Sequence, residues 1–248
     1  MDEKKNIRLT LAYDGTGYHG WQRQKNGITI QEILEDNLGI ILGERVIVIG
    51  SGRTDAGVHA LHQVCNFKTA SGIAPESLRR AMNSLLRDDI YIHKAEYAPP
   101  GFHSRYSVKS KTYEYRIWNR KDENIFLRHY SWHVQKGLEM VKIRECLSLL
   151  AGKHDFSAFR STGSGNLNPV REMIRADATR DEQGLVTFVF EADGFLRHMV
   201  RNIVGTVVDV GTGRTGVDEF AAIFKSLDRK NAGIKCPPQG LFLTMVNY

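Results

Sequence analysis

The most reactive arrangement in this sequence is a single carboxylate beside a cation on a glycine-rich segment. Asp55 follows Arg53 by two residues within "SGRTDAGVHA" (51–60). Glycines allow unusual backbone angles and the close approach of another molecule. A nearby cation favours the ionised form of an acid, and an ionised aspartate is a good nucleophile or base. The segment therefore indicates either chemistry by Asp55 or a structural turn in which this carboxylate caps backbone amides.

Two other segments match the dinucleotide-binding pattern G-x-G-x-x-G, namely "GTGYHG" (15–20) and "GTGRTG" (211–216). A dinucleotide site needs a strand running into the glycines, a helix leaving them and an acid about 20 residues later. The first segment leads into residues without helical periodicity, and the second follows residues with helical spacing and lacks the later acid. We interpret both as turn glycines, and a dinucleotide oxidoreductase stays open as an alternative.

Metal and thiol sites lack the spacing that they need. The three cysteines form no CxxC pair, which argues against a disulfide framework and a cysteine zinc site and favours small buried side chains; they are Cys65, Cys146 and Cys236. No G-x-S-x-G nucleophile elbow occurs. Two histidine pairs have no nearby third ligand; they are His59 with His62 and His129 with His133. We therefore expect no metal site.

The charge favours a polyanionic partner. The 248 residues carry a net charge of +6, and arginine outnumbers lysine. A guanidinium binds phosphate and stacks on bases, and aromatic and basic residues interleave in "YHGWQRQK", "FHSRYSVKSKTYEYR" and "FLRHMVR". The alternative is a mildly basic protein without such a partner. No run of about 18 apolar residues and no apolar signal-peptide core occurs, so we expect a cytoplasmic protein outside membranes.

Hydrophobic periodicity predicts the elements that position these residues. In the first half, Thr29 and Glu32 form a capping box for one helix, which Gly43 can end. Pro75 begins a second helix, whose apolar face is Leu78, Met82, Leu85 and Leu86. The predicted elements are a strand at 6–14, a helix at 29–43, a buried strand at 45–50, a strand at 61–69, a helix at 74–86 and a strand at 90–97.

The same order recurs after a turn-rich boundary at 98–110. The predicted elements are a strand at 111–118, a helix at 138–151 that Gly152 can end, strands at 170–180 and 184–192, helices at 194–210 and 217–227, and a strand at 240–248. Two β-α-β-β-α-β units predict an α+β fold: two ferredoxin-like halves (1–106 and 107–248) forming a mainly antiparallel sheet, with helices packed on it and a basic cleft.

Six segments, in this order and spacing, resemble the bacterial tRNA pseudouridine synthase A family. They are "YDGTGYHGWQRQ", "SGRTDAGVHA", "FHSRYSVKSKTYEYRI", "DFSAFR", "GFLRHMVRNIVG" and "PPQGLFL". The resemblance runs from about Ile7 to Tyr248. Ser104, where the family often has alanine, and Cys236, before the final prolines, depart from the pattern outside the reacting residues.

The resemblance implies an isomerase that converts uridine to pseudouridine at positions 38, 39 and 40 of the tRNA anticodon stem-loop. The family's nucleophile falls on Asp55, and the arginine two residues before it falls on Arg53. The tyrosine that packs against the target base falls on Tyr113, and the arginine that pairs with the catalytic aspartate falls on Arg201. The resemblance also implies a homodimer and a reaction without cofactor.

Four basic residues flank aromatic residues in two loop regions and are candidates for phosphate contacts; they are Arg23, Lys25, Lys109 and Lys111. Solvated surface charge is the alternative for each of them. Besides the oxidoreductase, a non-catalytic RNA-binding protein with the same fold stays open. It would bind tRNA without changing it, although an aspartate flanked by both arginines argues against this reading.

Overall fold

The fold is known from a computed structural model, which describes residues 4–163 and 168–248. Within these ranges the chain forms ten strands, five α-helices and three short 3-10 helices, which confirms the α+β class. The chain divides into two compact units. One comprises residues up to Lys109 together with Leu243–Tyr248, and the other comprises Ser110–Phe242. The last strand, β10 (Leu241–Asn247), carries residues of both. The domain bounds predicted from the sequence stay a prediction.

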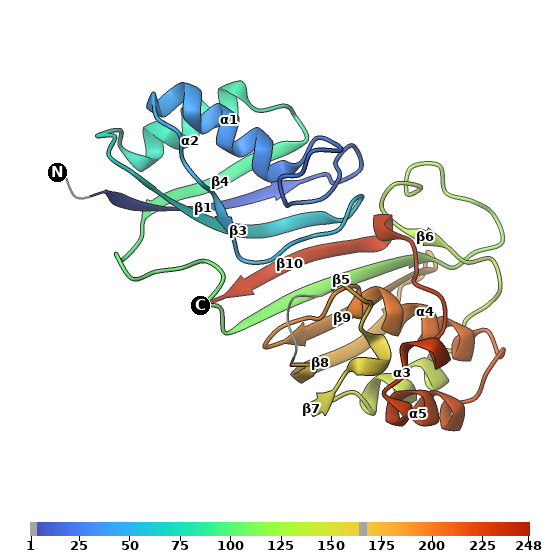
Figure 1. Ribbon diagram of the computed structural model, residues 1–248. Coiled ribbons are helices and arrows are strands. Elements are labelled where there is room, and N and C mark those ends of the chain that lie inside the picture. The colour runs from blue at the N-terminus through green and yellow to red at the C-terminus, as the bar shows by residue number, and fades with distance from the viewer. Residues whose placement is uncertain (1–3, 164–167) are drawn as a thin grey trace. The chain divides into compact units, whose positions relative to one another are not determined.

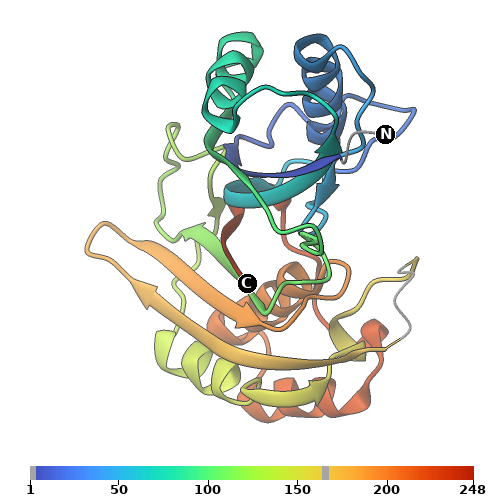
Figure 2. The same cartoon turned by 90° about the vertical axis from the view of Figure 1, so that its left-hand side faces the viewer.

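The first unit has the predicted β-α-β-β-α-β order. Its elements are β1 (Lys5–Tyr13), α1 (Ile30–Leu42), β2 (Ile49–Gly50), β3 (His59–Thr69), α2 (Pro75–Leu85) and β4 (Ile90–Tyr97). The strands pair antiparallel in the order β4-β1-β3-β2, as in a split β-α-β unit. Figures 1 and 2 show α1 and α2 side by side on one face of these strands.

Local sequence accounts for these elements. Alternate residues of β1 are fully buried, among them Leu9 and Leu11, as the period of two requires. The Thr29 hydroxyl caps α1 by accepting a hydrogen bond from the Glu32 amide (3.4 Å). Gly43 ends α1 in the left-handed conformation (φ 67°), which glycine adopts at low cost. The structure therefore confirms Thr29 as the N-cap and Gly43 as the C-cap of this helix.

The predicted buried strand at 45–50 is wrong for most of its length, because only Ile49–Gly50 pairs with a neighbouring strand. The backbone of Val48 is bound instead by side chains of α1. Its amide donates to Glu35 Oε1 (3.0 Å), and its carbonyl accepts from Gln31 Nε2 (3.1 Å). The valines of this segment are buried as the alternation indicates. Their partner is a helix rather than a sheet.

The second unit contains β5 (Ser110–Trp118), β6 (Trp132–His133), α3 (Met140–Ser148), β7 (Gly152–Asp155), β8 (Val170–Arg180), β9 (Leu185–Ala192), α4 (Met199–Gly211) and α5 (Val217–Ser226). Three 3-10 helices are η1 (Ser157–Phe159), η2 (Arg229–Asn231) and η3 (Pro238–Gly240). The strands pair antiparallel in the order β5-β9-β8-β7, and β6 pairs parallel with β5. Helix α3 contacts β8, α4 contacts β5, and α5 packs on both helices. Figure 1 shows the three helices gathered together.

Several predicted details differ from the structure. Leu85 is 48% exposed, because α2 ends there and Leu86 completes the buried face from an extended backbone. The predicted helix at 138–151 is confined to α3, because the amides of Leu149 and Leu150 donate to carbonyls three residues earlier, as in a 3-10 turn. The predicted helix at 194–210 begins only at Met199. The short strands β6 and β7 were not predicted. None of the helices in the described ranges is long and apolar enough to cross a membrane.

Candidate active site

The Asp55 loop, defined here as residues 51–58, leaves β2 and enters β3. Buried hydrogen bonds hold its first residues. The Ser51 amide donates to the Val64 carbonyl (2.7 Å), and the Ser51 hydroxyl donates to Gln63 Oε1 (2.6 Å). Gln63 Nε2 in turn donates to the Gly52 carbonyl (3.1 Å). A buried amide side chain on β3 therefore fixes how the loop leaves the sheet.

The centre of the loop is tied to β1. The Tyr13 hydroxyl lies 2.8 Å from Thr54 Oγ1, and the Thr54 carbonyl accepts from the Trp21 amide (3.1 Å). Burial raises the pKa of Tyr13 to about 12, so its hydroxyl stays protonated and able to donate at neutral pH. Asp55 is half-buried, and its carbonyl accepts from the Val58 amide (3.1 Å) in a tight turn. The carboxylate thus stands on a well-anchored backbone.

Residues 14–21 pack their backbone directly against the Asp55 loop. A Cβ on Gly15 would lie 2.0 Å from the Val58 carbonyl oxygen, and a Cβ on Gly20 would lie 2.6 Å from the Thr54 carbonyl oxygen. Gly20 also has a positive φ of 86°. Close backbone packing therefore explains Gly15 and Gly20 of the first G-x-G-x-x-G match, whereas a Cβ on Gly17 would meet nothing within 4 Å. Those of the second match lie where α4 ends and α5 begins.

Arg53 is exposed, and a chain of side-chain amides leads from α1 to it. Arg53 Nε donates to Gln22 Oε1 (2.9 Å), Gln22 Nε2 donates to Gln31 Oε1 (2.6 Å), and Gln31 Nε2 donates to Glu35 Oε1 (2.9 Å). These hydrogen bonds orient the guanidinium from behind. Sequence reasoning missed Gln22 and Gln31. The only signal for them was the presence of Gln22 in the family segment "YDGTGYHGWQRQ".

Tyr113 lies on β5 in the second unit, 8% exposed, with the ring of Phe195 packed against it edge-to-face (centroids 4.9 Å apart, 79°). Tyr113, Tyr115 and Ile117 share the buried face of β5, as the alternation predicts. The Tyr115 hydroxyl donates to the Pro237 carbonyl (2.8 Å), and burial raises its pKa well above the usual value. Tyr115 is therefore a structural anchor between β5 and the segment before β10.

Arg201 lies on α4, 6% exposed. Its Nε donates to the Cys236 carbonyl (2.9 Å), and the Cys236 amide donates to the Arg201 carbonyl (3.2 Å). One turn later, a Cβ on Gly205 would lie 1.8 Å from the Ile234 carbonyl oxygen. The segment before the final strand therefore packs on α4 through its backbone.

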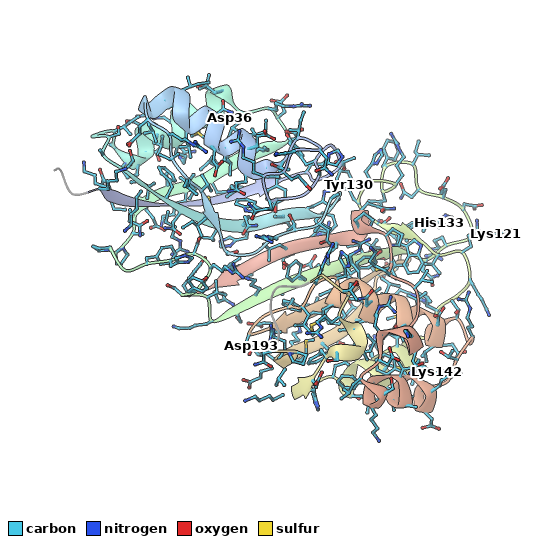
Figure 3. All side chains as sticks on the ribbon, in the orientation of Figure 1. Asp36, Lys121, Tyr130, His133, Lys142 and Asp193 are labelled. Carbon is cyan, nitrogen blue, oxygen red and sulfur yellow. The ribbon has the colours of Figure 1, made fainter. Side chains whose placement is uncertain are left out.

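The phosphate candidates differ in their surroundings. Arg23 is held by three carboxylates: its Nη1 lies 3.1 Å from both Glu35 and Asp36, and its Nη2 lies 3.6 Å from Glu32. Figure 3 marks Asp36 on α1. A phosphate would have to compete with all three acids for this guanidinium. The other three are Lys25 and Lys109, which are exposed, and Lys111, which is half-buried.

Metal-ligating groups are dispersed. Within residues 4–163 and 168–248, no three histidine, cysteine, aspartate or glutamate side chains are grouped to hold a metal ion. His59 is buried, and its Nδ1 lies 3.1 Å from both the Gly15 amide nitrogen and Asp14 Oδ1. This histidine connects β3 to the segment 14–21. The three cysteines are buried, which confirms that part of the prediction.

The four residues that the resemblance singled out are thus divided between the units. Asp55 and Arg53 stand together on one loop of the first unit, supported by β1, β3 and α1. Tyr113 and Arg201 stand on β5 and α4 of the second unit, which contact each other. In chemical terms, the first unit offers a half-buried carboxylate with an oriented guanidinium. The second offers an aromatic ring and a buried guanidinium.

Comparison with known proteins identifies the family. The tRNA pseudouridine synthase family profile matches residues 10–107 and 147–248. A "tRNA pseudouridine synthase A" of Thermoanaerobacter sp. (strain X514) is 45% identical over 244 residues, 98% of this chain and 100% of that protein. The protein of the same name from Acetivibrio thermocellus is 43% identical over the same shares. "tRNA pseudouridine synthase A 1" of Protochlamydia amoebophila is 43% identical over 97% of this chain and 95% of that protein.

These matches cover both units and every segment of the resemblance. The family profile includes the Asp55 loop, and it includes α4 with Arg201. Identities above 40% over nearly the whole length extend the likeness to the supporting elements. This chain therefore belongs to the tRNA pseudouridine synthase family, which is a family of isomerases.

Proposed function

We propose that this protein isomerises uridine to pseudouridine at positions 38, 39 and 40 of the tRNA anticodon stem-loop, with Asp55 as the reacting group. The observation that carries the proposal is the anchoring of the Asp55 loop. Tyr13 is hydrogen-bonded to the Thr54 side chain and Gln63 to the Gly52 carbonyl before the half-buried carboxylate, and after it the Val58 amide donates to the Asp55 carbonyl. Such preorganisation is expected of a catalytic group and is more than a surface turn requires.

The reaction breaks the bond between uracil N1 and ribose C1′, turns the uracil while it stays bound, and joins C1′ to C5. The C5 proton is released, N1 gains a proton, and no electrons are exchanged with another molecule. Asp55 can act by attacking C1′, by attacking C6 or by removing the 2′ proton, and each of these routes requires an ionised carboxylate. No water has to be activated, so no second acid is needed beside it.

The other residues have supporting roles in this proposal. Arg53 and Arg201 orient the Asp55 carboxylate, because a guanidinium stays charged in a protein. Tyr113 packs against the uracil ring. The base must leave the RNA stack, which costs a few kcal/mol that contacts to the phosphate backbone can offset. We propose such contacts for Lys25, Lys109 and Lys111. At Arg23 a phosphate would have to compete with the three carboxylates that already bind the guanidinium.

Release of tritium from uracil C5 tests the proposed reaction. Unmodified tRNA carrying [5-³H]uridine at positions 38 to 40 is incubated with the wild type and with Asp55→Asn, which removes the charge but keeps the shape. We expect release by the wild type and a loss of at least about 1,000-fold in Asp55→Asn, as for other catalytic nucleophiles. Asp88→Asn is the matched control, because Asp88 is exposed and lies in the turn before β4.

Two results would contradict the proposal. Absence of release by the wild type from every tRNA with uridine at these positions would exclude the activity and leave a protein that only binds RNA. Release by Asp55→Asn at the rate of Asp88→Asn would exclude the role of Asp55. We further propose a cytoplasmic homodimer, as the family resemblance implies. A monomer mass in light scattering at micromolar concentration would contradict the dimer.

A further inference from the structure

The start of the first strand forms a basic hollow that the proposed chemistry does not use. A cavity of about 500 Å³ lies at this end of the first unit. We call it the lysine pocket; it is lined by Lys4, Lys5, Asn6, Lys68, Tyr97, Ala98 and Pro100. Strand pairing brings these residues together, since Asn6 lies opposite Lys68 and Ile7 opposite Tyr97. The pocket therefore belongs entirely to one unit.

Within residues 4–163 and 168–248, the acid beside the pocket, Glu44, engages its cations only at long range. Lys4 Nζ lies 3.9 Å from Glu44 Oε2, a long ion pair. The Glu44 carboxylate is already bound by the Thr69 hydroxyl and the Ala70 amide, and these hydrogen bonds, the Thr69 bond first, lower its pKa. Lys5 and Lys68 are exposed. In the part of the chain that the structure describes, the pocket thus presents three exposed lysines to solvent.

The remaining groups complete a surface for a nucleic-acid chain. Tyr97 is 53% exposed, and Lys5 Nζ lies 5.8 Å from the centre of its ring. The amide of Asn6 is fully occupied: Nδ2 donates to the Pro99 and Phe102 carbonyls, and Oδ1 accepts from Asn66. Asn6 therefore shapes the floor, and the lysines and the tyrosine are left to contact a ligand.

This combination suits a phosphodiester backbone. Lysines on flexible stems act as point charges that follow a phosphate chain, whereas recognition of a single phosphate favours the arginine fork. An exposed aromatic ring beside them can stack on a base of any sequence. We infer that the lysine pocket is a second contact for tRNA, remote from the reacting uridine. This inference rests on the proposed function for the identity of the RNA.

The distance to the Asp55 loop decides which part of the tRNA can reach the pocket. Lys5 and Tyr13 are the two ends of β1, and Tyr13 is hydrogen-bonded to Thr54 next to Asp55. In Figure 1 the start of β1 lies next to the N-terminus, at the opposite end of the strand from Tyr13. Eight steps of about 3.3 Å separate the two ends by roughly 26 Å. Stacked RNA nucleotides rise by no more than about 3.4 Å each, so that span corresponds to at least about eight nucleotides.

A comparison of two RNAs tests the inference. One is full-length tRNA, and the other is a hairpin with the same reacting loop and a stem of about five base pairs, too short to span that distance. Binding of each is measured by fluorescence anisotropy over a range of salt concentrations. In the doubly substituted Lys5→Ala/Lys68→Ala protein we expect about tenfold weaker binding of full-length tRNA. The slope of log Kd against log salt should fall by about 2, and hairpin binding should be unchanged.

Matched variants separate the pocket from general charge and from folding. Lys142→Ala/Lys225→Ala removes the same charge from α3 and α5, where Figure 3 marks Lys142, and should bind both RNAs as the wild type does. Lys5→Arg/Lys68→Arg should keep wild-type binding. Tyr97→Ala should weaken only full-length tRNA, by about tenfold, whereas Tyr97→Phe should not.

The outcomes also distinguish this inference from the proposed function. Equal binding of full-length tRNA by the two double-alanine variants overturns the pocket. If Lys5→Ala/Lys68→Ala weakens binding of full-length tRNA and of the hairpin equally, the pocket is not remote from the reacting uridine, and that part of the inference is overturned. A wild type that shows the lysine-dependent salt slope but releases no tritium supports the pocket and contradicts the isomerase proposal. If the wild type releases tritium while the pocket variants bind tRNA normally, the result supports the isomerase proposal and contradicts the pocket.

Discussion

The backbone of His198 adopts the left-handed conformation (φ 61°, ψ 10°) at the N-cap of α4, three residues before Arg201. Non-glycine residues pay about 1–2 kcal/mol for this conformation, and β-branched residues pay the most. The carbonyl of the preceding Arg197 accepts from the Ser161 amide (3.1 Å), which holds the chain in a direction that a continuous helix could not follow. The strain at His198 thus sets where α4 begins and how Arg201 is presented.

Substitutions at His198 test this account at the residue scale. Because glycine adopts a positive φ freely and asparagine tolerates it, we expect stability in the order His198→Gly, His198→Asn, His198→Val. The valine variant should be about 1–3 kcal/mol less stable than the glycine variant. The free energy of unfolding in urea provides the measurement. If the valine variant proved as stable as the glycine variant, the left-handed backbone would have no energetic importance.

Tyr13 and Thr54 likewise determine the position of a neighbouring residue, in this case in the Asp55 loop. Their buried hydroxyls form one hydrogen bond of 2.8 Å, and Gln63 Nε2 reaches the Tyr13 hydroxyl at 3.4 Å. These contacts hold Thr54, the residue before Asp55. Their importance lies in the position that they give to a neighbour.

Backbone contact between two loops is the feature that matters most at the scale of elements. The segment 14–21 lies against the Asp55 loop through glycines, and the Gly57 amide donates back to the Tyr18 carbonyl (3.3 Å). Side chains would hold these loops apart, because a Cβ needs more than 3 Å of space. Gly15 and Gly20 of this segment therefore allow close support of the backbone that carries Asp55.

Gly20 and Gly17 offer a matched pair for testing this contact. In Gly20→Ala, the new Cβ would meet the Thr54 carbonyl at 2.6 Å with φ at 86°, whereas a Cβ on Gly17 meets nothing within 4 Å. We expect Gly20→Ala to lose about 1–3 kcal/mol of stability and to lower kcat for tritium release. Gly17→Ala should change stability by less than about 0.5 kcal/mol.

Thermal unfolding and single-turnover kinetics measure the two effects. An unchanged Tm together with an unchanged kcat in Gly20→Ala would show that the loops can separate without consequence. Equal losses in both alanine variants would show that flexibility, rather than the close approach at Gly20, is what glycine contributes here.

The protein as a whole contains thiols that are buried in both units. Burial raises the pKa of Cys236 to about 12 and raises that of Cys65 far above its usual value. In the unfolded chain, cysteines lose their protons near pH 8.5 to 9. Above that pH the folded state holds protons that the unfolded state has lost. The stabilising contribution of these thiols is therefore complete below about pH 8.5 and decreases as the pH rises toward 12.

Alkaline unfolding follows from these raised pKa values. Each such thiol should lower the free energy of unfolding by about 1.4 kcal/mol per pH unit once the unfolded cysteine is ionised. We expect urea midpoints to fall clearly between about pH 8 and about pH 10.5. Cys65→Ala and Cys236→Ala should each reduce the slope of the unfolding free energy against pH by the contribution of one thiol, about 1.4 kcal/mol per pH unit. A midpoint that did not change over this range, or an unaltered slope in both variants, would contradict the assignment.

Local patterns in the sequence were sufficient for most elements. The alternation in β1, the spacing and caps of α1, and Pro75 at the start of α2 depend on neighbours in the chain, and the structure confirms them. The order of the longer elements in each half was also predictable, whereas the short strands β6 and β7 were not. The Asp55 loop could be located at a strand end, although its role came from the family resemblance, since a glycine-rich turn with one acid has a structural explanation too.

Tertiary structure alone decided which partner each segment uses. Residues 45–48 have the alternation of a strand, but Gln31 and Glu35 of α1 bind the backbone of Val48, and no periodicity indicates that. The start of α4, the amides that orient Arg53 and the lysine pocket likewise depend on residues that folding brings together from distant positions. Periodicity in a chain records which side of an element is buried. Its partner is selected by packing and hydrogen bonds that exist only in the folded protein.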